Sequence, residues 1–282
     1  MEFKILNGAE PTHFTVLFRG KYMKNKIIAS LQARVIRPWQ TDHFEKTRSG
    51  KHLQLYKGIH NGESCFLIGN GPSLRAEDLT AIHQAGIPTF AFNRIFYIFD
   101  QTPWRPTYYI SQDEKMLAGC ADAVNQLNLP HKFIPINLRW YFDIHIKDAE
   151  EFLLGGAKDQ DFWFADDIAH SVCWASTVMY TAAQFAVYMG FKKIYLIGVD
   201  HHFHISRDRH GNIIVDDTVK DYFTDQYNPD KDSLFIPSTD ISTDTYYAMK
   251  KHCDQRGVEV YNATRGGKLE VFPRVDFCSI IS

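Results

Sequence analysis

The sequence of 282 residues predicts an α/β fold, namely a doubly wound, mostly parallel Rossmann-like sheet with an irregular lid insertion and a basic N-terminal arm. Three observations predict this fold. Cys65–Ile68 is an apolar run typical of a strand buried on both faces, and it leads into a glycine turn and a helical pattern. Strand and helix patterns then alternate along the chain, which favours βαβ units and a parallel sheet. Small and polar residues follow several strands, at the edge where such sheets bind ligands.

The predicted elements follow one another from residue 64 onward. Strands are short apolar runs, whereas helices show apolar residues three or four positions apart. The strongest strand is Lys193–Val199, and the helix before it, Ser176–Met189, stops at Gly190. Predicted strands are 65–68, 88–92, 107–110, 132–136, 193–199 and 258–261, and predicted helices start at Leu74 or span 115–127, 176–189 and 240–256.

Charge divides the chain into two predicted parts, a basic arm and linker at residues 1–60 and a nucleotide-binding α/β domain at residues 61–282. Residues 1–57 hold eleven Lys and Arg against four Asp and Glu, whereas the whole chain has a net charge of −2. Within the arm, Tyr22–Val35 shows a helical apolar stripe. Such a helix suits a membrane surface or an acidic glycan, and it equally suits packing on its own domain. Two segments of the domain, 137–170 and 204–238, lack a regular pattern and are predicted lid-like insertions.

The composition is that of an ordinary globular protein, with 45% hydrophobic and 23% charged residues. No apolar run approaches the roughly 20 residues of a membrane span, and the first residues lack the layout of a signal peptide. The five cysteines are scattered, as expected in a reducing compartment. We therefore expect a cytoplasmic protein that the arm can bring to the inner face of a membrane. We expect no nucleic-acid partner, because the body is acidic.

The turn after the first strand, Gly69-Asn70-Gly71-Pro72-Ser73, is the first candidate binding site. Gly69 and Gly71 permit a positive φ or a close backbone approach, and Pro72 suits the first turn of a helix. The N–H groups at the start of a helix favour a phosphate. Similar turns occur in βα units that bind no ligand, so the prediction of a binding site depends on the other residues that lie near this turn.

Four further segments with polar residues come directly after predicted strands. They are Asn93, Ser111-Gln112-Asp113, Asp200-His201-His202 and Asn262-Ala263-Thr264. Because the carboxyl ends of parallel strands share one edge of a sheet, we expect these residues and the glycine turn to surround one cleft. The alternative is that strand ends are polar because loops are exposed.

The densest group of titratable residues is Asp200-His201-His202-Phe203-His204. If the strand continued, Asp200, His202 and His204 would share one side of it, and His201 would face the other. A histidine with a pKa near 6.5 can protonate a leaving phosphate or take a proton from an acceptor hydroxyl. Two imidazoles and a carboxylate could also hold a metal, and histidines at a strand end can have neither role.

Three local patterns occur together in this chain. They are Ile68-Gly-Asn-Gly-Pro-Ser-Leu74, Ser176-Thr-Val178 at the start of a helix, and Gly190-Phe-Lys-Lys-Ile-Tyr-Leu-Ile-Gly-Val-Asp200. In this order they resemble the bacterial and archaeal family labelled 6-hydroxymethylpterin diphosphokinase-like, which is found beside polysaccharide genes. They are more remotely similar to the bacterial sialyltransferases that use CMP-sialic acid. The end, Tyr261–Lys268, also looks like the former family, so the resemblance covers residues 60–275 and leaves out the arm.

The sialyltransferase resemblance implies a donor site. Asn70 and Ser73 would contact the phosphate and ribose, and Asn93 the nucleotide or sugar. Ser176 and Thr177 would hold the carboxylate of the donor sugar, for which hydroxyls and free N–H groups at a helix start are suited. The residues that we place in the donor site are Gly69, Asn70, Gly71, Ser73, Asn93, Ser111, Gln112, Asp113, Ser176, Thr177 and Asp200.

Two positions depart from the sialyltransferase pattern. The relatives have a tyrosine two residues after the strand-end aspartate, where this chain has His202. Their general-base histidine precedes the last long helix, where this chain has Pro237-Ser-Thr-Asp240. Our candidates for the base are therefore His202 and Asp240, and Tyr222 and Tyr227 are candidate contacts for the leaving phosphate.

These inferences predict a glycosyltransferase that moves an acidic sugar from a CMP-activated donor to a glycan acceptor in surface polysaccharide synthesis, by an inverting single displacement. We expect no cofactor and no metal; besides the CMP-sugar and the glycan, candidate partners are a membrane surface and a second copy of the chain. One alternative is a 6-hydroxymethylpterin diphosphokinase, which would use ATP and Mg²⁺. Another is a non-catalytic module that binds a nucleotide or a glycan.

Overall fold

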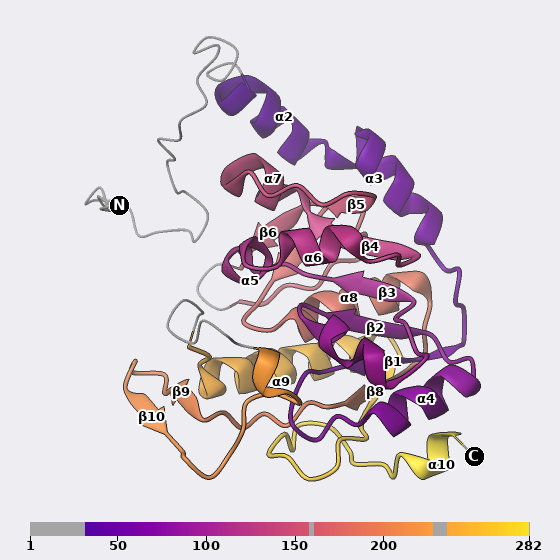
Figure 1. The fold of residues 1–282 in the computed structure, drawn as a ribbon. Coiled ribbons are helices and arrows are strands. Elements are labelled where there is room, and N and C mark those ends of the chain that lie inside the picture. The colour runs from indigo at the N-terminus through magenta and orange to yellow at the C-terminus, as the bar shows by residue number, and fades with distance from the viewer. Residues whose placement is uncertain (1–31, 158–160, 228–235, 282) are drawn as a thin grey trace.

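The computed structural model describes residues 32–157, 161–227 and 236–281, and a seven-stranded sheet forms its centre (Figure 1). The strands lie in the order β11-β8-β1-β2-β3-β4-β5, and every neighbouring pair is parallel. The predicted doubly wound, mostly parallel α/β class is therefore confirmed. The seven strands are β1 (Ser64–Ile68), β2 (Thr89–Phe92), β3 (Tyr108–Ile110), β4 (His131–Pro135), β5 (Ala149–Phe152), β8 (Lys193–Ile197) and β11 (Glu259–Asn262).

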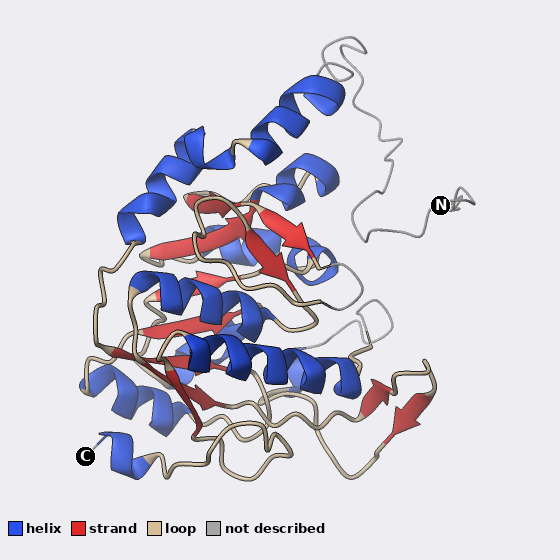
Figure 2. Ribbon diagram, turned by 180° about the vertical axis from the view of Figure 1, so that it is seen from behind, coloured by secondary structure: helices blue, strands red, loops and turns tan. Residues whose placement is uncertain are grey.

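Helices cover both faces of the sheet, which gives three layers (Figures 1 and 2). Side chains alternate along each strand, so Phe66 and Ile68 of β1 enter one core and Cys65 and Leu67 enter the other. One face carries α4 (Ala76–Gln84), the 3-10 helix η4 (Ile95–Gln101), α5 (Glu114–Ala118), α6 (Ala121–Gln126) and α10 (Cys278–Ile281), and the other carries α8 (Val178–Met189) and α9 (Thr239–Gln255).

The strand order reverses beside β1. From β1 the chain runs through β2, β3 and β4 to β5 at one edge of the sheet. It then returns through a small parallel pair, β6 (Leu154–Gly156) and β7 (Val172–Trp174), and through α8, and it enters β8 on the other side of β1. Ile68 of β1 lies level with Ala91 of β2 and Ile197 of β8. The loops after β1 and β8 therefore start at one level, and the chain continues from them to helices on opposite faces of the sheet, α4 and α9. Such a reversal point is where doubly wound sheets form a crevice.

Residues 32–56 are helical, where the sequence predicts a linker from residue 38. Phe44, Leu53 and Tyr56 are buried in the main core, and α3 lies along the edge strand β5 (Figure 1). Most of the predicted arm helix, Tyr22–Val35, falls outside the described residues. The elements here are η1 (Gln32–Ile36), α2 (Arg37–Asp42), η2 (Phe44–Lys46), α3 (Arg48–Leu53) and η3 (Gln54–Tyr56).

Two other segments differ from the sequence prediction. The predicted helix 115–127 is divided into α5 and α6 at Gly119 and Cys120. The predicted insertion 137–170 contains most of α7 (Ile136–Phe142) and the edge strand β5. The sequence of β5, Ala-Glu-Glu-Phe, has no β-branched residue and no alternation, so periodicity could not identify it.

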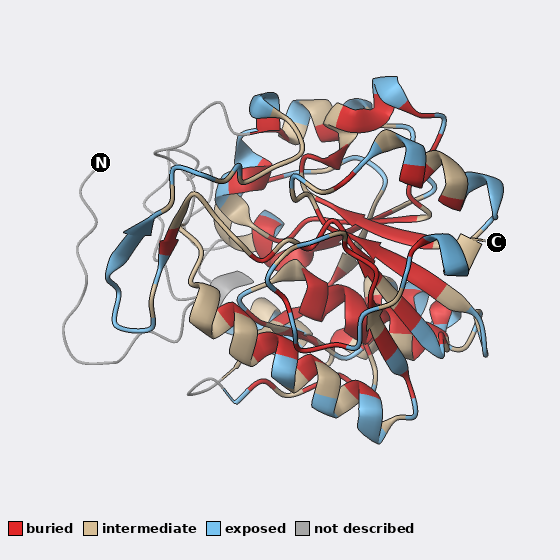
Figure 3. Ribbon diagram, turned by 90° about the horizontal axis from the view of Figure 1, so that it is seen from below, coloured by how far each residue is buried: buried red, intermediate tan, exposed pale blue. Residues whose placement is uncertain are grey.

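The described part of the second predicted insertion begins with a small hairpin, β9 (Ile205–Arg207) and β10 (Ile213–Val215), which projects with exposed residues in Figure 3. The short 3-10 helix η5 (Asp225–Tyr227) follows, and its Tyr227 is only 1% exposed. Within the described ranges, no helix combines the length and the apolar character that crossing a membrane requires.

Candidate active site at the reversal of strand order

A cavity of about 190 Å³ lies at the crevice between β1 and β8. The turns after these two strands line it, together with the start of α8, two tyrosines of the segment after β10, and α9. Nine residues of the predicted site line the cavity: Gly69, Asn70, Gly71, Asn93, Ser176, Thr177, Asp200, His202 and Tyr222. The other five do not line it: Ser73, Ser111, Gln112, Asp113 and Asp240.

The glycine turn passes very close to the turn after β8. The N–H of Gly69 donates to the carbonyl of Ile197 at 2.7 Å, and that of Gly71 donates to the carbonyl of Gly198 at 2.9 Å. A Cβ atom on Gly69 would overlap the Gly198 carbonyl, and one on Gly71 would overlap the carboxylate of Asp200. Neither glycine has a positive φ. Of the two reasons that the sequence offered for these glycines, close backbone approach is therefore the one that applies.

The start of α4 does not face the cavity, contrary to the sequence prediction. The helix begins at Ala76, beyond Pro72, and its first turn carries Glu77 and Asp78. The turn before it also uses its donors within the protein, because the backbone N–H and the hydroxyl of Ser73 donate to Asp200 at 3.3 and 2.7 Å. A phosphate at this helix end is therefore not supported.

Asn70 joins the β1 turn to two neighbouring segments. Its Nδ2 donates to the carbonyl of Phe92 at 3.2 Å and to the hydroxyl of Tyr227 at 2.9 Å. Its Oδ1 is buried and has no hydrogen-bond partner. An unpaired buried acceptor is costly, so Oδ1 needs a donor that the described residues do not supply. Since both N–H groups are in use, Asn70 cannot also donate to a phosphate, as the sequence had suggested.

The residues after β2 and β3 support the cavity wall. Asn93 adopts a left-handed conformation with φ 54°, and its side-chain oxygen accepts from the hydroxyl of Ser111 at 3.1 Å. Ser111 is fully buried, and Gln112 accepts from Thr181 of α8 at 2.6 Å. Asp113 caps the start of α5. These contacts join the strand ends to the helices, and only Asn93 among these predicted residues meets the cavity.

The start of α8 faces the cavity through Ser176, Thr177 and Val178. The side chain of Thr177 accepts from the N–H of Met179 at 3.3 Å and so caps the helix. The hydroxyl of Ser176 lies 2.8 Å from that of Thr245 in α9, which links the two helices. The first N–H groups of a helix lack carbonyl partners within it, so this end of α8 favours an anion.

Asp200 and His202 extend from the turn after β8. Burial raises the pKa of Asp200, and the hydrogen bonds from Ser73 oppose part of that rise. His202 Nε2 lies 2.9 Å from the carboxylate Oδ2 of Asp216, and its side chain is about one-third exposed. The carboxylate of Asp216 fixes the orientation of the His202 ring, and His202 lines the cavity.

Two stacked tyrosines close one side of the cavity. The rings of Tyr222 and Tyr227 are 4.0 Å apart between centroids and inclined by 14°. Tyr227 is fixed by Asn70 and by the guanidinium of Arg94, which donates to its carbonyl at 2.6 Å. The hydroxyl of Tyr222 has no hydrogen-bond partner among the described residues. Burial raises the pKa of Tyr222 to about 12, so this hydroxyl keeps its proton at neutral pH.

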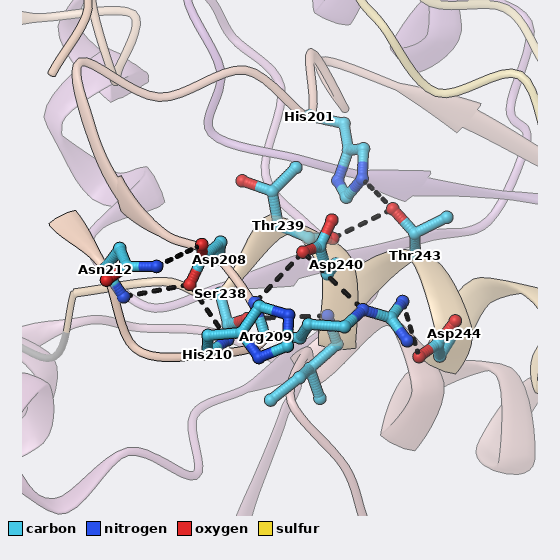
Figure 4. A network of polar contacts seen from close by, with 11 residues as sticks. His201, Asp208, Arg209, His210, Asn212, Ser238, Thr239, Asp240, Thr243 and Asp244 are labelled. Atoms are coloured by element: carbon cyan, nitrogen blue, oxygen red, sulfur yellow. Dashed lines mark hydrogen bonds and ion pairs between the residues drawn. The ribbon is translucent and has the colours of Figure 1, made fainter. Parts of the chain in front are cut away.

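Asp240 is held away from the cavity, on α9. Its carboxylate accepts from the backbone N–H of Arg209 at 3.0 Å and lies 3.9 Å from that side chain (Figure 4). Asp244 lies 3.7 Å from the same guanidinium. The residue that caps α9 is Ser238. The structure therefore offers no contact between the predicted base Asp240 and the other site residues.

The histidines after β8 diverge. His201 Nε2 lies 2.7 Å from the hydroxyl of Thr243 in α9, whereas His202 and His204 both turn toward Asp216. Over the part of the chain that the structure describes, no group of three or more His, Cys, Asp or Glu is arranged to hold a metal. The histidine cluster therefore does not have the geometry that the metal alternative needs.

Sequence reasoning missed several residues that line the cavity: Met116, Phe203, Asp221 and Tyr246. It placed His201 on the opposite side of an extended strand, but β8 ends at Ile197 and His201 has a positive φ of 53°. No signal in the sequence marks that change of direction. Tyr246 belongs to the buried face of α9, which the helical stripe could have indicated.

A parallel, doubly wound sheet with a cavity at its reversal point is the architecture in which α/β proteins commonly bind ligands, at the carboxyl ends of the strands. No family model matches this chain, and no curated protein matches it. Among solved structures it is similar to the MAf glycosyltransferase from Magnetospirillum magneticum AMB-1, with 16% identity and a TM-score of 0.47. The match covers 90% of this chain and 43% of that one, so this chain spans less than half of that protein.

Proposed function

We propose that the protein is a glycosyltransferase that moves an acidic sugar from a CMP-activated donor to a glycan acceptor. The observation that carries the proposal is the buried Oδ1 of Asn70, which has no partner among the described residues and belongs to the wall of a cavity that Tyr222 also lines. Oδ1 of Asn70 is a hydrogen-bond acceptor, and the hydroxyl of Tyr222 can be a donor. A nucleotide can form hydrogen bonds with both groups, because its hydroxyl or amino groups are donors and its phosphate oxygens are acceptors.

The Asn70 side of the cavity suits the nucleotide. Oδ1 of Asn70 would accept from a ribose hydroxyl or a base amino group, and the Tyr222 hydroxyl would donate to the phosphate. Behind them, Arg94 is 4% exposed, and no carboxylate of the described residues forms an ion pair with it. A buried cation whose hydrogen bond goes to a neutral carbonyl favours a nearby anion, and in this chain that anion would be the phosphate of the donor.

The α8 side of the cavity suits the sugar. The capped helix start at Ser176 and Thr177 would hold a carboxylate, which is the reason to propose an acidic sugar. The volume of about 190 Å³ is below the roughly 300–1,000 Å³ of pockets that enclose a whole ligand. The cavity would therefore enclose the phosphate and the reacting sugar carbon, with the rest of the donor in the open crevice.

The reaction would be a single displacement. The bond between the anomeric carbon and the phosphate oxygen breaks as the acceptor oxygen attacks, so negative charge grows on the departing phosphate. The Tyr222 hydroxyl and the positive potential of Arg94 would stabilise that charge. The diphosphokinase alternative has less support, because no group of three or more His, Cys, Asp or Glu among the described residues is arranged to hold a metal ion.

Nucleotide binding can be tested with the unmodified protein. The melting temperature would be measured with CMP, UDP, GDP and ATP, each with and without Mg²⁺. We expect CMP to stabilise the protein without Mg²⁺, because binding to the folded state raises its stability. A response to ATP that requires Mg²⁺ would favour the diphosphokinase, and no response to any nucleotide would contradict the proposal.

Catalysis needs a separate test. The protein would be incubated with CMP-N-acetylneuraminic acid, with and without lactose, and the release of CMP would be followed. We expect release that is faster with the acceptor. Binding of CMP without any release would support a non-catalytic nucleotide-binding module.

A further inference from the structure

The proposed function leaves open which residue takes the proton from the acceptor hydroxyl. We propose that His201 takes the proton from the acceptor hydroxyl, an inference that rests on the proposed glycosyltransferase function. Neither His202 nor Asp240 has this role in our proposal, because His202 is directed to Asp216 and Asp240 is paired with Arg209.

The backbone places His201 in the cavity wall. His201 has a φ of 53°, a conformation that costs energy for a residue with a side chain, although histidine tolerates it better than most. This conformation turns the side chain toward α9, where the ring packs edge-on against Tyr246 with centroids 5.5 Å apart. The residue is 9% exposed, and it belongs to the lining of the cavity where substrate would bind.

Hydrogen bonds determine which ring nitrogen carries the proton. The hydroxyl of Thr243 donates to the carbonyl of Thr239 at 2.8 Å, so its single hydrogen is already used. At the 2.7 Å contact with His201 Nε2, the Thr243 oxygen must therefore accept, and Nε2 must carry the hydrogen (Figure 4). In a neutral ring this leaves Nδ1 as an unprotonated acceptor. Nδ1 has no partner among the described residues, so it is available to a substrate.

The charged groups around His201 are all engaged elsewhere. On α9, Asp240 and Asp244 are paired with Arg209, and Tyr246 presents an aromatic edge. On its own turn, Asp200 accepts from Ser73, and His202 contacts Asp216. Burial lowers the pKa of His201, so the ring is neutral at pH 7. A neutral imidazole with one fixed N–H and one free lone pair is the form that a general base requires.

The proposed step combines one proton transfer with the exchange of one bond at the anomeric carbon. The acceptor O–H proton moves to Nδ1 of His201, and the acceptor oxygen forms its bond to the anomeric carbon. The bond from that carbon to the phosphate oxygen breaks, and its electron pair leaves with CMP. The imidazolium then returns its proton to solvent. Thr243 is a positioning residue in this scheme, because it acts only through the ring of His201.

The experiment is chemical rescue of His201→Gly. Glycine adopts the φ of 53° without strain, and it leaves a space that free imidazole can fill. We expect the rate of CMP release with CMP-N-acetylneuraminic acid and lactose to fall at least 100-fold and to be partly restored by imidazole, with unchanged CMP affinity. Rescue should follow the fraction of neutral imidazole as the pH changes. His145→Gly, at an exposed histidine with a partner in Asp143, is the matched control and should keep its rate.

The outcomes separate the two proposals. A wild-type protein that neither binds CMP nor releases it from the donor overturns the function, and the His201 proposal with it. An active wild type and a His201→Gly variant within twofold of its rate overturn the His201 proposal alone. A variant that loses both rate and CMP binding, without rescue, assigns His201 a structural role and also overturns the proposal.

A second measurement does not depend on activity. Nitrogen chemical shifts of the His201 ring report which nitrogen is protonated. We expect the Nε2–H form in the wild type and a mixture of the two forms in Thr243→Val, where the accepting oxygen is removed. An Nδ1–H ring in the wild type would leave no free lone pair in the cavity and would contradict the proposal.

Discussion

At the scale of single residues, Asn70 has two separable roles. Its Nδ2 holds the β1 turn to β2 and to Tyr227, whereas its Oδ1 has no partner in the described part of the chain. The first role concerns stability and the second concerns binding. One substitution affects both, so stability and affinity must be measured together.

We expect Asn70→Ala to weaken CMP binding by roughly tenfold or more, because a lost buried hydrogen bond costs about 1–3 kcal/mol. The melting temperature should fall by a few degrees, since the Tyr227 hydroxyl and the Phe92 carbonyl lose their donor. Calorimetric titration measures the CMP affinity, and a thermal melt measures the melting temperature. Asn125→Ala, at an exposed asparagine that donates to a backbone carbonyl, is the control for affinity. Unchanged CMP affinity in Asn70→Ala would remove the β1 turn from the binding site.

Tyr222 and Tyr227 allow a matched comparison, because the two rings stack and differ in the partners of their hydroxyls. We expect Tyr222→Phe to leave the melting temperature unchanged and to lower the rate of CMP release by roughly 100-fold, the usual effect of removing a donor to developing charge. Tyr227→Phe should instead lower stability, since Asn70 loses an acceptor. If Tyr222→Phe retains the full rate, the leaving phosphate does not contact this hydroxyl.

At the scale of elements, the site depends on how closely the turns after β1 and β8 approach. The strand pairing brings their ends level, and the two turns then contact each other through backbone hydrogen bonds. We expect Gly69→Ala to destabilise the protein by about 1–3 kcal/mol, because its Cβ would meet the rigid carbonyl of Gly198. Gly156→Ala has nothing within 4 Å of the added atom and should change stability by less than about 0.5 kcal/mol. Denaturant unfolding measures both variants, and equal stabilities would show that the turns separate easily.

The sequence identifies elements where one local pattern decides them. β1 and β8 are apolar runs, and α8 ends at Gly190, so their places in a parallel sheet could be inferred. The rule that ligands bind at the carboxyl ends of strands then brought Asn70, Asn93 and Asp200 to one cavity. The three residues come from distant segments, and only the order of the strands brings them together.

The remaining features depend on tertiary contacts that no local pattern encodes. β5 consists of Ala-Glu-Glu-Phe, and its strand conformation depends on pairing with β4. His201 turns toward α9 through one backbone dihedral angle, which a period-2 pattern cannot predict. Asp240 occupies the sequence position of a base, yet Arg209 from the β9–β10 hairpin pairs with it. In each case a partner far away in the sequence decides the outcome.

At the scale of the whole molecule, a polar cluster fastens the N-terminal helices to the far edge of the sheet. Glu150 of β5 accepts from Tyr56 of η3, and it lies 2.7 Å from His131 of β4 and 2.9 Å from His52 of α3. Burial alone would raise the pKa of Glu150, but the contacts with His131 and Tyr56 outweigh it, so the pKa is lowered from its ordinary value of 4.5. The ionised carboxylate is therefore the form of Glu150 that holds η3, α3 and β4 to β5.

This cluster predicts how stability depends on pH. Because the pKa of Glu150 is lower in the folded state, its contribution is present above about pH 4.5 and is lost as the pH falls through the folded-state value. We expect Glu150→Gln to reduce the free energy of unfolding by about 2 kcal/mol at pH 7, since a buried charged acceptor is lost, and by less at a pH below 4.5. Glu270→Gln, which breaks an exposed pair with Arg274, should have little effect at either pH. Urea unfolding at the two pH values tests this, and an equal loss at both would show that the charge of Glu150 does not stabilise the contact between the helices and the sheet.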